Sequence, residues 1–160
     1  MLDYTLVTPK ATYRALTPRD VPGFLRLVAG CHQEELPGTN ISSDQILATV
    51  RELQRHKEKG SILVFEREES LIGYCILIPL WSNTYGGVLL VIDELYVAPI
   101  QRTQGIAEDF ITLLKKVAPR DCVAIRLDVN RAGRKTLSSY KKLGFAESER
   151  ATLTMKVERD

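Results

Sequence analysis

The residues whose types and spacing most clearly point to a chemical function lie between Ile92 and Ala107, in the sequence IDELYVAPIQRTQGIA. An apolar run ends at Pro99, and the segment Arg102-x-x-Gly105-x-Ala107 leads directly into a helical pattern. Backbone N–H groups at such a loop-to-helix junction have no intrahelical partner and carry partial positive charge, so they can bind a diphosphate. Gly105 and Ala107 suit this use, because a large side chain would keep phosphate away from the backbone. The spacing therefore predicts a phosphate cradle.

The elements that must position this segment can be predicted from apolar spacing and turn residues. Residues 88–98 read as a long strand, apolar apart from Asp93 and Glu94, and therefore central and buried on both faces. The charged segment 67–70 reads as the turn of an antiparallel hairpin. In chain order, elements are expected at 12–16 (strand), 17–30 (helix), 42–60 (helix), 61–66 (strand), 71–80 (strand), 88–98 (strand), 105–117 (helix), 123–129 (strand), 135–143 (helix) and 145–157 (closing hairpin).

The order β-α-α-β-β-β-α-β-α-β-β predicts an α/β (α+β) fold, in which a central, mixed and mostly antiparallel twisted sheet is flanked by about four helices. The 160 residues contain no repeat, low-complexity tract or shift in composition, so a single domain over residues 1–160 is expected. With 44% hydrophobic and 26% charged residues, the composition is ordinary for a globular protein.

Composition also argues against several classes of function. No run approaches the roughly 18 apolar residues of a membrane span, and the first residues lack the basic and apolar regions of a signal peptide. A cytoplasmic protein without a membrane partner is therefore expected. The net charge of +2 is too small to indicate a nucleic-acid partner.

The residue types that most often bind metals are few and scattered. Cys31, Cys75 and Cys122 lie far apart without a Cys-x-x-Cys pair, which argues against a disulfide framework or a zinc site and predicts buried, small apolar residues. His32 and His56 lie in predicted helices without further ligands nearby, so no metal is expected.

The order of elements and two motifs together resemble a known family. The motifs are Leu95-Tyr96-Val97-x-Pro99-x-x-Arg102-x-x-Gly105-x-Ala107 and Tyr140-x-x-x-Gly144-Phe145. In this order and at this separation, they are similar to motifs of the GNAT superfamily of N-acetyltransferases, and the resemblance covers nearly the whole chain. It implies the GNAT fold, with acetyl-CoA as the acetyl donor and cosubstrate.

The resemblance also implies a set of coenzyme contacts. The pantetheine of acetyl-CoA would pair like an extra strand with the end of the fourth strand, and the pyrophosphate would lie over the following loop and helix. A strand that ends at a proline and parts from its neighbour leaves N–H and C=O groups that pantetheine amides can satisfy. The residues so implied are Leu95, Tyr96, Val97, Arg102, Thr103, Gln104, Gly105, Ile106 and Ala107.

Two positions depart from the family pattern. Many relatives have glycine where this chain has Thr103, and many have asparagine where it has Gly133. The first change leaves Gly105 and Ala107, the positions closest to phosphate, intact. The second leaves a coenzyme contact unassigned, for which Asn130, at the end of its strand, could supply a substitute amide.

Acetyl transfer to an amine needs a neutral amine, a stabilised oxyanion and a proton for the departing thiolate. An alkylamine with a pKa near ~10.4 is neutral in about one molecule in two thousand at pH 7, roughly 4 to 5 kcal/mol uphill, so a base or a desolvated site matters most. The family often has a carboxylate at the position of Asp93, and some polyamine acetyltransferases have acids at both Asp93 and Glu94. Neighbours in a strand point to opposite faces, so only one should face the acceptor. We favour Asp93 as the base over Glu94, and a buried carboxylate paired with an arginine is the structural alternative.

Tyr140 matches the usual general acid of the family, the phenol that donates a proton to the coenzyme sulfur. The resemblance also implies that the backbone N–H of Val97 would meet the oxyanion. The structural alternative for Tyr140 is an aromatic residue on the inner face of the last helix, since Leu137 and Leu143 share that spacing.

The acceptor is the least determined part of the reaction. Trp81 and Tyr85 lie near the end of the sheet where acceptors bind in relatives, and Glu34 and Glu35 could attract a cation. Loop packing and a solvated acidic segment are the alternatives. A small, cationic amine is therefore expected as the acceptor, with a protein lysine or N-terminal amine as the alternative substrate.

A non-catalytic module that senses CoA is the alternative class of function. It would need neither Tyr140 nor a carboxylate at Asp93, so their presence argues against it. An exposed closing hairpin would favour a homodimer.

Overall fold

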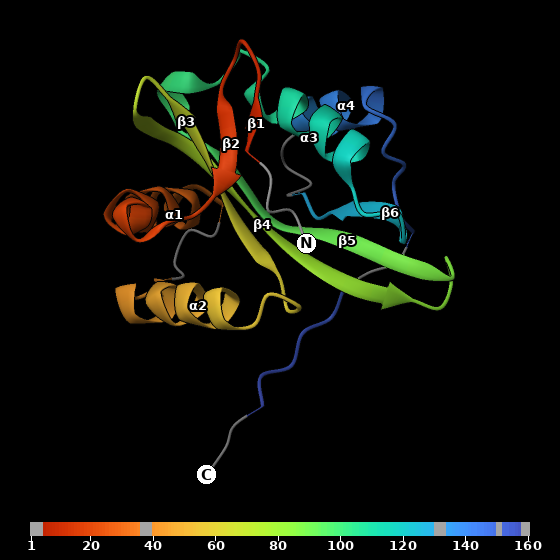
Figure 1. Cartoon of the computed structure of the whole chain (residues 1–160). Helices are drawn as coiled ribbons and strands as arrows, with labels where there is room; N and C mark the ends of the chain where they lie inside the picture. The colour runs from red at the N-terminus through yellow and green to blue at the C-terminus, as the bar shows by residue number, and fades with distance from the viewer. Residues whose placement is uncertain (1–4, 36–39, 130–133, 150–151, 158–160) are drawn as a thin grey trace.

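The computed structural model describes residues 5–35, 40–129, 134–149 and 152–157 (Figure 1). Over this part of the chain, a six-stranded sheet has the order β1-β2-β3-β4-β5-β6, so strands that follow each other in sequence lie side by side. The strands are β1 (Leu6–Val7), β2 (Thr12–Ala15), β3 (Ser61–Arg67), β4 (Ser70–Ser82), β5 (Gly87–Val97) and β6 (Cys122–Leu127). The helices are α1 (Val21–Glu35), α2 (Ser43–Arg55), α3 (Ile106–Val117) and α4 (Arg134–Lys142), with short 3-10 turns at Pro18–Asp20 and Pro99–Gln101.

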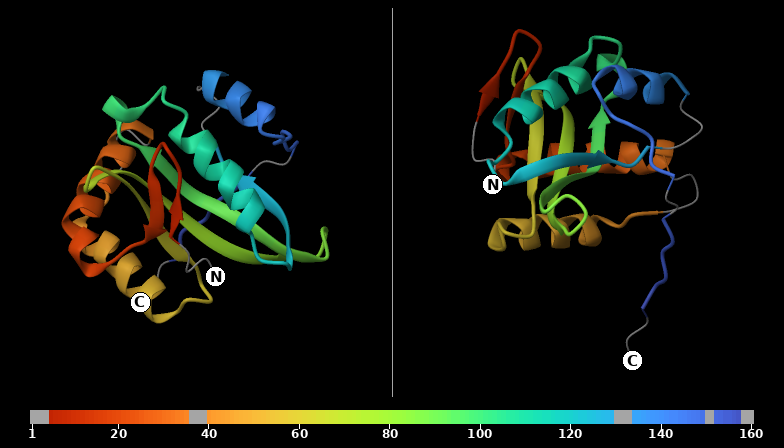
Figure 2. Two further views of the ribbon diagram at one scale, coloured as in Figure 1. Left: turned by 45° about the horizontal axis from the view of Figure 1, so that its top comes forward. Right: turned by 90° about the vertical axis from the view of Figure 1, so that its right-hand side faces the viewer.

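Neighbouring strands run antiparallel except for β5 and β6, which are parallel. A parallel pair needs a crossover connection, and α3 supplies it. Helices α1 and α2 cover one face of the sheet, and α3 and α4 lie on the other side (Figures 1 and 2). The predicted mixed, mostly antiparallel sheet flanked by helices is confirmed.

Each face of the sheet has its own apolar layer. On the α3 face, the rings of Tyr13, Phe65 and Phe110 pack together with centroids 4.8 to 5.4 Å apart. On the α1 face, Phe24 packs edge-on against Tyr74, with centroids 5.1 Å apart. β5 contributes to both layers, with Leu90 and Ile92 on the α3 face and Tyr96 on the α1 face, as the nearly continuous apolar run predicts.

The first two helices begin close to their predicted starts but end differently. Ser42 and Gln45 form a reciprocal cap at the start of α2: the Gln45 N–H donates to Ser42 Oγ (3.2 Å), and the Ser42 N–H donates to Gln45 Oε1 (2.9 Å). Helix α1 continues five residues past Gly30, where an end was predicted. A Cβ at Gly30 would lie 2.9 Å from the Tyr96 hydroxyl, so this glycine allows α1 to approach β5 rather than ending the helix. Helix α2 ends at Arg55 instead of near Gly60.

The two ends of the chain differ from the prediction. The closing hairpin predicted over 145–157 is wrong where the structure describes it, because residues 145–149 and 152–157 contain no strand. Leu153, Met155 and Val157 alternate as in a strand, yet they are 94%, 86% and 78% exposed. Alternation shows which side chains could share a face, whereas a strand also needs a partner for its backbone. Conversely, β1 is too short to show a period and is not predicted.

The remaining expectations about composition concern cysteines and membranes. Cys31 and Cys75 are buried, as predicted, and Cys122 is partly buried. Within the described residues, no helix combines the length and the apolarity needed to cross a membrane.

Candidate functional site

The candidate site begins where β5 and β6 part. The parallel pairing of these strands ends at Ile92 with Leu127, whereas the pairing of β5 with β4 continues to Val97. Among the described residues, the last part of β5 therefore has a strand partner on one edge and none on the other. This open edge lies next to the loop that leads to α3 (Figure 1).

The direction of the backbone groups at this edge follows from one hydrogen bond. The Ala98 N–H donates to the Ile72 carbonyl of β4 (2.8 Å), and successive residues of an antiparallel strand direct their backbone groups to opposite edges. The N–H groups of Leu95 and Val97 therefore face away from β4, toward the open edge. This geometry fits the predicted pairing with pantetheine and the predicted oxyanion contact of Val97.

A β-bulge interrupts the strand just before this edge. Ile92 lies opposite Leu77 and Glu94 lies opposite Ile76, so Asp93 is an extra residue without a partner on β4. Strict alternation therefore does not apply to Asp93. The bulge explains why two adjacent carboxylates have different surroundings without simply occupying opposite faces.

Glu94 is held by hydrogen bonds on the α1 face. The Tyr74 hydroxyl donates to Glu94 Oε2 (2.6 Å), and His32 Nε2 of α1 lies 3.1 Å from Glu94 Oε1. Burial of Tyr74, with the negative charge of Glu94 beside it, raises the pKa of its phenol far above the ordinary value, so Tyr74 remains a donor. The structural alternative predicted an arginine as the partner of this carboxylate, whereas the partners in the structure are a tyrosine and a histidine.

Asp93 has a different environment. Taken over all its atoms, Asp93 is exposed to solvent. No hydrogen bond or ion pair of its carboxylate is found within the described part of the chain. Partial burial of the carboxylate raises its pKa, and the nearby charges of Glu94 and Asp128 raise it further. Asp128 directly follows β6, just as Asp93 directly follows the last β5–β6 pair, so parallel pairing brings the two together. Sequence spacing misses Asp128, because only this pairing relates it to β5.

The predicted phosphate cradle lies at the start of α3. Gly105 caps the helix with φ 68° and ψ 31°, a left-handed conformation that glycine adopts without strain. Ile106 and Ala107 then open the helix, so their N–H groups belong to its first turn. Thr103 also has a φ of 68°, at the position where many relatives carry glycine. Gln104 accepts a hydrogen bond from Arg67 through its side-chain oxygen.

Arg102 ties the cradle loop to α1. Its Nη2 lies 2.7 Å from Glu34 Oε2, its Nε donates to the Val97 carbonyl (2.8 Å), and its guanidinium lies 5.2 Å from the centroid of the Tyr96 ring. The Tyr96 hydroxyl donates to Glu34 Oε1 (2.9 Å), and burial and Glu34 raise the pKa of Tyr96 to about 12. The structure thus brings together Tyr96 and Arg102, which were predicted to contact the coenzyme, and Glu34, which was predicted to contact the acceptor.

Tyr140 lies on α4 and packs toward the sheet. Its ring is 6.0 Å from that of Phe145, and both rings pack against the apolar layer on the α3 face. This placement agrees with an aromatic residue on the inner face of the helix and leaves its predicted role as an acid untested. Asn130 and Gly133 lie outside the described residues, as does the side chain of Glu35.

Trp81 and Tyr85 lie at the other end of the β4–β5 hairpin. They are 68% and 61% exposed, and Trp81 pairs with Val88. Val88 precedes Asp93 by five residues, which corresponds to roughly 16 Å along a strand. The structure therefore does not bring these aromatic residues next to the carboxylates.

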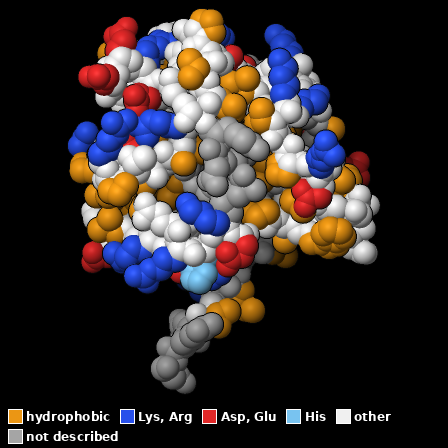
Figure 3. Space-filling model, viewed as in Figure 1, with side chains coloured by type: hydrophobic (Ala, Val, Ile, Leu, Met, Phe, Trp, Pro, Cys, Tyr) orange, Lys and Arg blue, Asp and Glu red, His pale blue; other side chains and the backbone are white. Residues whose placement is uncertain are grey.

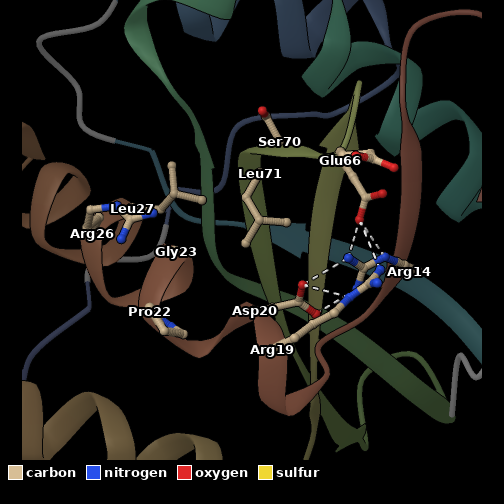
Figure 4. Close-up of a pocket in the computed structure, with 11 residues that line it drawn as sticks. Arg14, Arg19, Asp20, Pro22, Gly23, Arg26, Leu27, Glu66, Ser70 and Leu71 are labelled. Atoms are coloured by element: carbon tan, nitrogen blue, oxygen red, sulfur yellow. Dashed lines mark hydrogen bonds and ion pairs between the residues drawn. The ribbon is translucent and has the colours of Figure 1, made fainter.

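A surface pocket of about 640 Å³ lies near the start of α1 and the β3–β4 turn (Figure 4), and its lining includes no residue of β5. Part of its charged wall is internally paired: Arg14 donates to both oxygens of Asp20 (2.7 and 2.9 Å) and, through Nε, to Glu66 (2.9 Å). Asp20 is 5% exposed, and Arg14 holds the pKa of its carboxyl well below the ordinary value. Sequence reasoning misses this pair, which stabilises the fold.

The charges on the face seen in Figure 3 are dispersed, with lysine and arginine side chains in separate groups rather than in one continuous patch. Within the described residues, no group of three or more histidine, cysteine, aspartate or glutamate side chains could hold a metal ion.

Comparisons with known proteins agree with this architecture. The possible acetyltransferase from Clostridium difficile 630 has a TM-score of 0.79 and 19% identity, over 93% of this chain and 99% of that one. Ribosomal-protein-alanine N-acetyltransferase from Brucella melitensis biovar Abortus 2308 has a TM-score of 0.71 and 22% identity, over 92% and 99%. AAC(6')-Iy, in complex with the bisubstrate analogue CoA-S-monomethyl-acetylneamine, has a TM-score of 0.72 and 17% identity, over 92% and 98%. At these identities the likeness shows the fold alone.

Among curated proteins, none matches significantly. The family model described as "Acetyltransferase (GNAT) family" matches residues 28–145, which include both motifs, the bulge and the cradle. With most of its length matched by this model, the chain belongs to the acetyltransferase (GNAT) family.

Proposed function

We propose that this protein is an N-acetyltransferase that moves an acetyl group from acetyl-CoA to the primary amine of a small, cationic acceptor. The observation that carries the proposal is the open end of β5. Three features follow one another there within 13 residues. They are the carboxylate of Asp93, which has no described partner, the backbone groups of Leu95 and Val97 at the open edge, and the helix capped by Gly105.

The donor would be bound mainly by backbone. The N–H groups of Leu95 and Val97 face the open edge and can pair with the amides of pantetheine. Beyond them, the first turn of α3 offers N–H groups to the pyrophosphate, and the left-handed Gly105 has no side chain of its own to block the approach.

The base would be Asp93. An aspartate of ordinary pKa is a weak base, and partial burial together with Glu94 and Asp128 raises the pKa of this one. The same three carboxylates would attract a cationic amine and lower the cost of placing it there. Glu94 is the less suitable base, because Tyr74 and His32 already bind its oxygens. The Val97 N–H would stabilise the oxyanion, and Tyr140 would protonate the departing thiolate.

A panel of primary amines, assayed for CoA thiol release with acetyl-CoA, tests this proposal. Diamines, aminoglycosides, amino acid derivatives and lysine-containing peptides should all be included, and a small cationic amine should be the best acceptor. Preference for a peptide amine would instead indicate a protein acetyltransferase. Binding of CoA without transfer to any amine would indicate a non-catalytic CoA module.

Variants of the two carboxylates test the base. Asp93→Asn should lower kcat/KM about a hundredfold or more, in the range of general base catalysis. Asp121→Asn makes the same chemical change at an exposed residue before β6 and should leave kcat/KM unchanged. A larger loss in Glu94→Gln than in Asp93→Asn would move the base to Glu94.

A further inference from the structure

The turn between β1 and β2 lies against the start of α3, although the two segments are about a hundred residues apart in sequence (Figure 2). Thr8 and Tyr13 fix this contact, because both hydroxyls donate to Asp109 Oδ2 of α3 at 2.7 Å. The turn itself closes with a hydrogen bond from the Thr8 N–H to the Ala11 carbonyl (3.0 Å). The position of this turn is therefore set by α3.

The turn places one side chain beside Gly105, at the start of the predicted cradle helix. Lys10 Nζ donates to the Gly105 carbonyl at 3.1 Å, and a Cβ added to Gly105 would lie 2.7 Å from the same nitrogen. The backbone of Lys10 is held on both sides: its N–H donates to Thr8 Oγ1 (3.1 Å), and its carbonyl accepts from Arg67 Nε (2.7 Å). The ammonium group is thus brought to Gly105 by a fixed backbone.

Two other cations near the cradle, Arg102 and Arg67, are already engaged. Arg102 binds Glu34 and the Val97 carbonyl, and Arg67 binds the Lys10 carbonyl and the side chains of the cradle loop. No ion pair of Lys10 is found in the described part of the chain. An ammonium group has three donors, of which the Gly105 carbonyl uses one.

One carboxylate also borders this place. Glu108 Oε2 lies 3.8 Å from where a Cβ of Gly105 would be. A diphosphate beside this carboxylate would be repelled unless a cation lay between or next to them. The ammonium group of Lys10 lies where its positive charge can offset the negative charge of Glu108.

We propose that Lys10 is a phosphate-binding residue of the coenzyme site, with its ammonium donating to the pyrophosphate of acetyl-CoA above Gly105. The inference rests on the proposed function, since it assumes that the cradle holds a coenzyme. It adds a charged side chain from the N-terminal hairpin to a site otherwise made of backbone N–H groups. In this arrangement Arg102 stabilises the loop, and Lys10 binds the ligand.

Calorimetric titration with CoA tests the proposal. Lys10→Ala should weaken CoA binding about tenfold, as expected for the loss of one charge-assisted hydrogen bond, and Lys10→Arg should restore most of the affinity. Lys116→Ala removes the same charge from the exposed last turn of α3 and should leave the affinity unchanged. Thermal unfolding of each variant, followed by circular dichroism, identifies any loss of fold.

Two truncated ligands identify the group that Lys10 binds. Dephospho-CoA keeps the pyrophosphate, so the tenfold loss should persist, whereas acetyl-pantetheine lacks all phosphates, and its KM should be the same in wild type and Lys10→Ala. Wild-type binding of CoA with no loss in Lys10→Ala would overturn the role of Lys10 and leave the proposed function standing. An equal loss with acetyl-pantetheine, or a loss that vanishes with dephospho-CoA, would also overturn it. No binding of CoA by the wild type would overturn both.

Discussion

Thr103→Gly should stabilise the protein, because Thr103 has a backbone conformation that suits glycine. Its φ of 68° lies in the left-handed region, which costs a residue with a Cβ about 1 to 2 kcal/mol. Glycine removes this cost but adds conformational freedom to the unfolded chain, which costs about 0.4 to 1 kcal/mol. The net gain in the free energy of unfolding is therefore expected to be about 0.5 to 1 kcal/mol. For a domain of this size, that corresponds to a rise in Tm of about 1 to 4 °C.

Urea unfolding and thermal scans of the free protein measure this effect. A matched control is Thr112→Gly, since Thr112 lies on the exposed side of α3 and the same substitution there should lower stability by roughly 0.5 kcal/mol. Thr103→Ala is a second control, because alanine keeps the Cβ and should gain little. A Tm that falls in Thr103→Gly, or rises equally in Thr103→Ala, would show that the left-handed conformation is not the source of the cost.

Four further outcomes are expected. Asp20→Asn should lower the free energy of unfolding by about 2 to 4 kcal/mol in urea titrations, since it leaves the buried side of Arg14 without its bidentate partner. Glu69→Gly should raise Tm by a few degrees, because Glu69 has a φ of 61° in the β3–β4 turn. Asp93 has a raised pKa in the folded state, so its own contribution to stability should be lost as pH rises above the ordinary value near ~3.9 through the folded pKa. Urea unfolding at several pH values measures this as a fall in the stability of the wild type relative to Asp93→Asn over that range. Tyr140→Phe should lower kcat in the thiol-release assay while calorimetry finds unchanged affinity for CoA, and unchanged turnover would remove the acid role.

The sequence predicts the elements that have strong periodic patterns. The apolar run at 88–98 identifies an interior strand, and Ser42 marks the start of α2, because these signals are local and the fold uses them directly. The same kind of local signal fails at Gly30 and at 145–157. Gly30 reflects the close approach of Tyr96 from another element, and the alternation of Leu153, Met155 and Val157 has no backbone partner within the described chain.

The candidate site is predictable only where its residues are contiguous. The motif that contains Gly105 identifies the cradle, whereas Asp128 and Lys10 come close to Asp93 and Gly105 through strand pairing and the packing of a distant turn. Spacing along the chain does not carry this information. Nor does it show that Arg102 is engaged by Glu34, because an ion pair between α1 and a loop depends on how the helix lies across the sheet.

The bulge in β5 has a consequence for how the strand tolerates changes in length. Ile92 faces the α3 layer and Glu94 faces the α1 layer, as two consecutive residues of a regular strand would. Removing Asp93 would therefore leave every other β5 side chain on its present face and make the pairing with β4 regular. Deletion of almost any other single residue within β5 would instead exchange the two faces on one side of the cut. Asp93 is thus a position in β5 that the hydrophobic core does not require, which is the property expected of a residue whose use lies in chemistry rather than in folding.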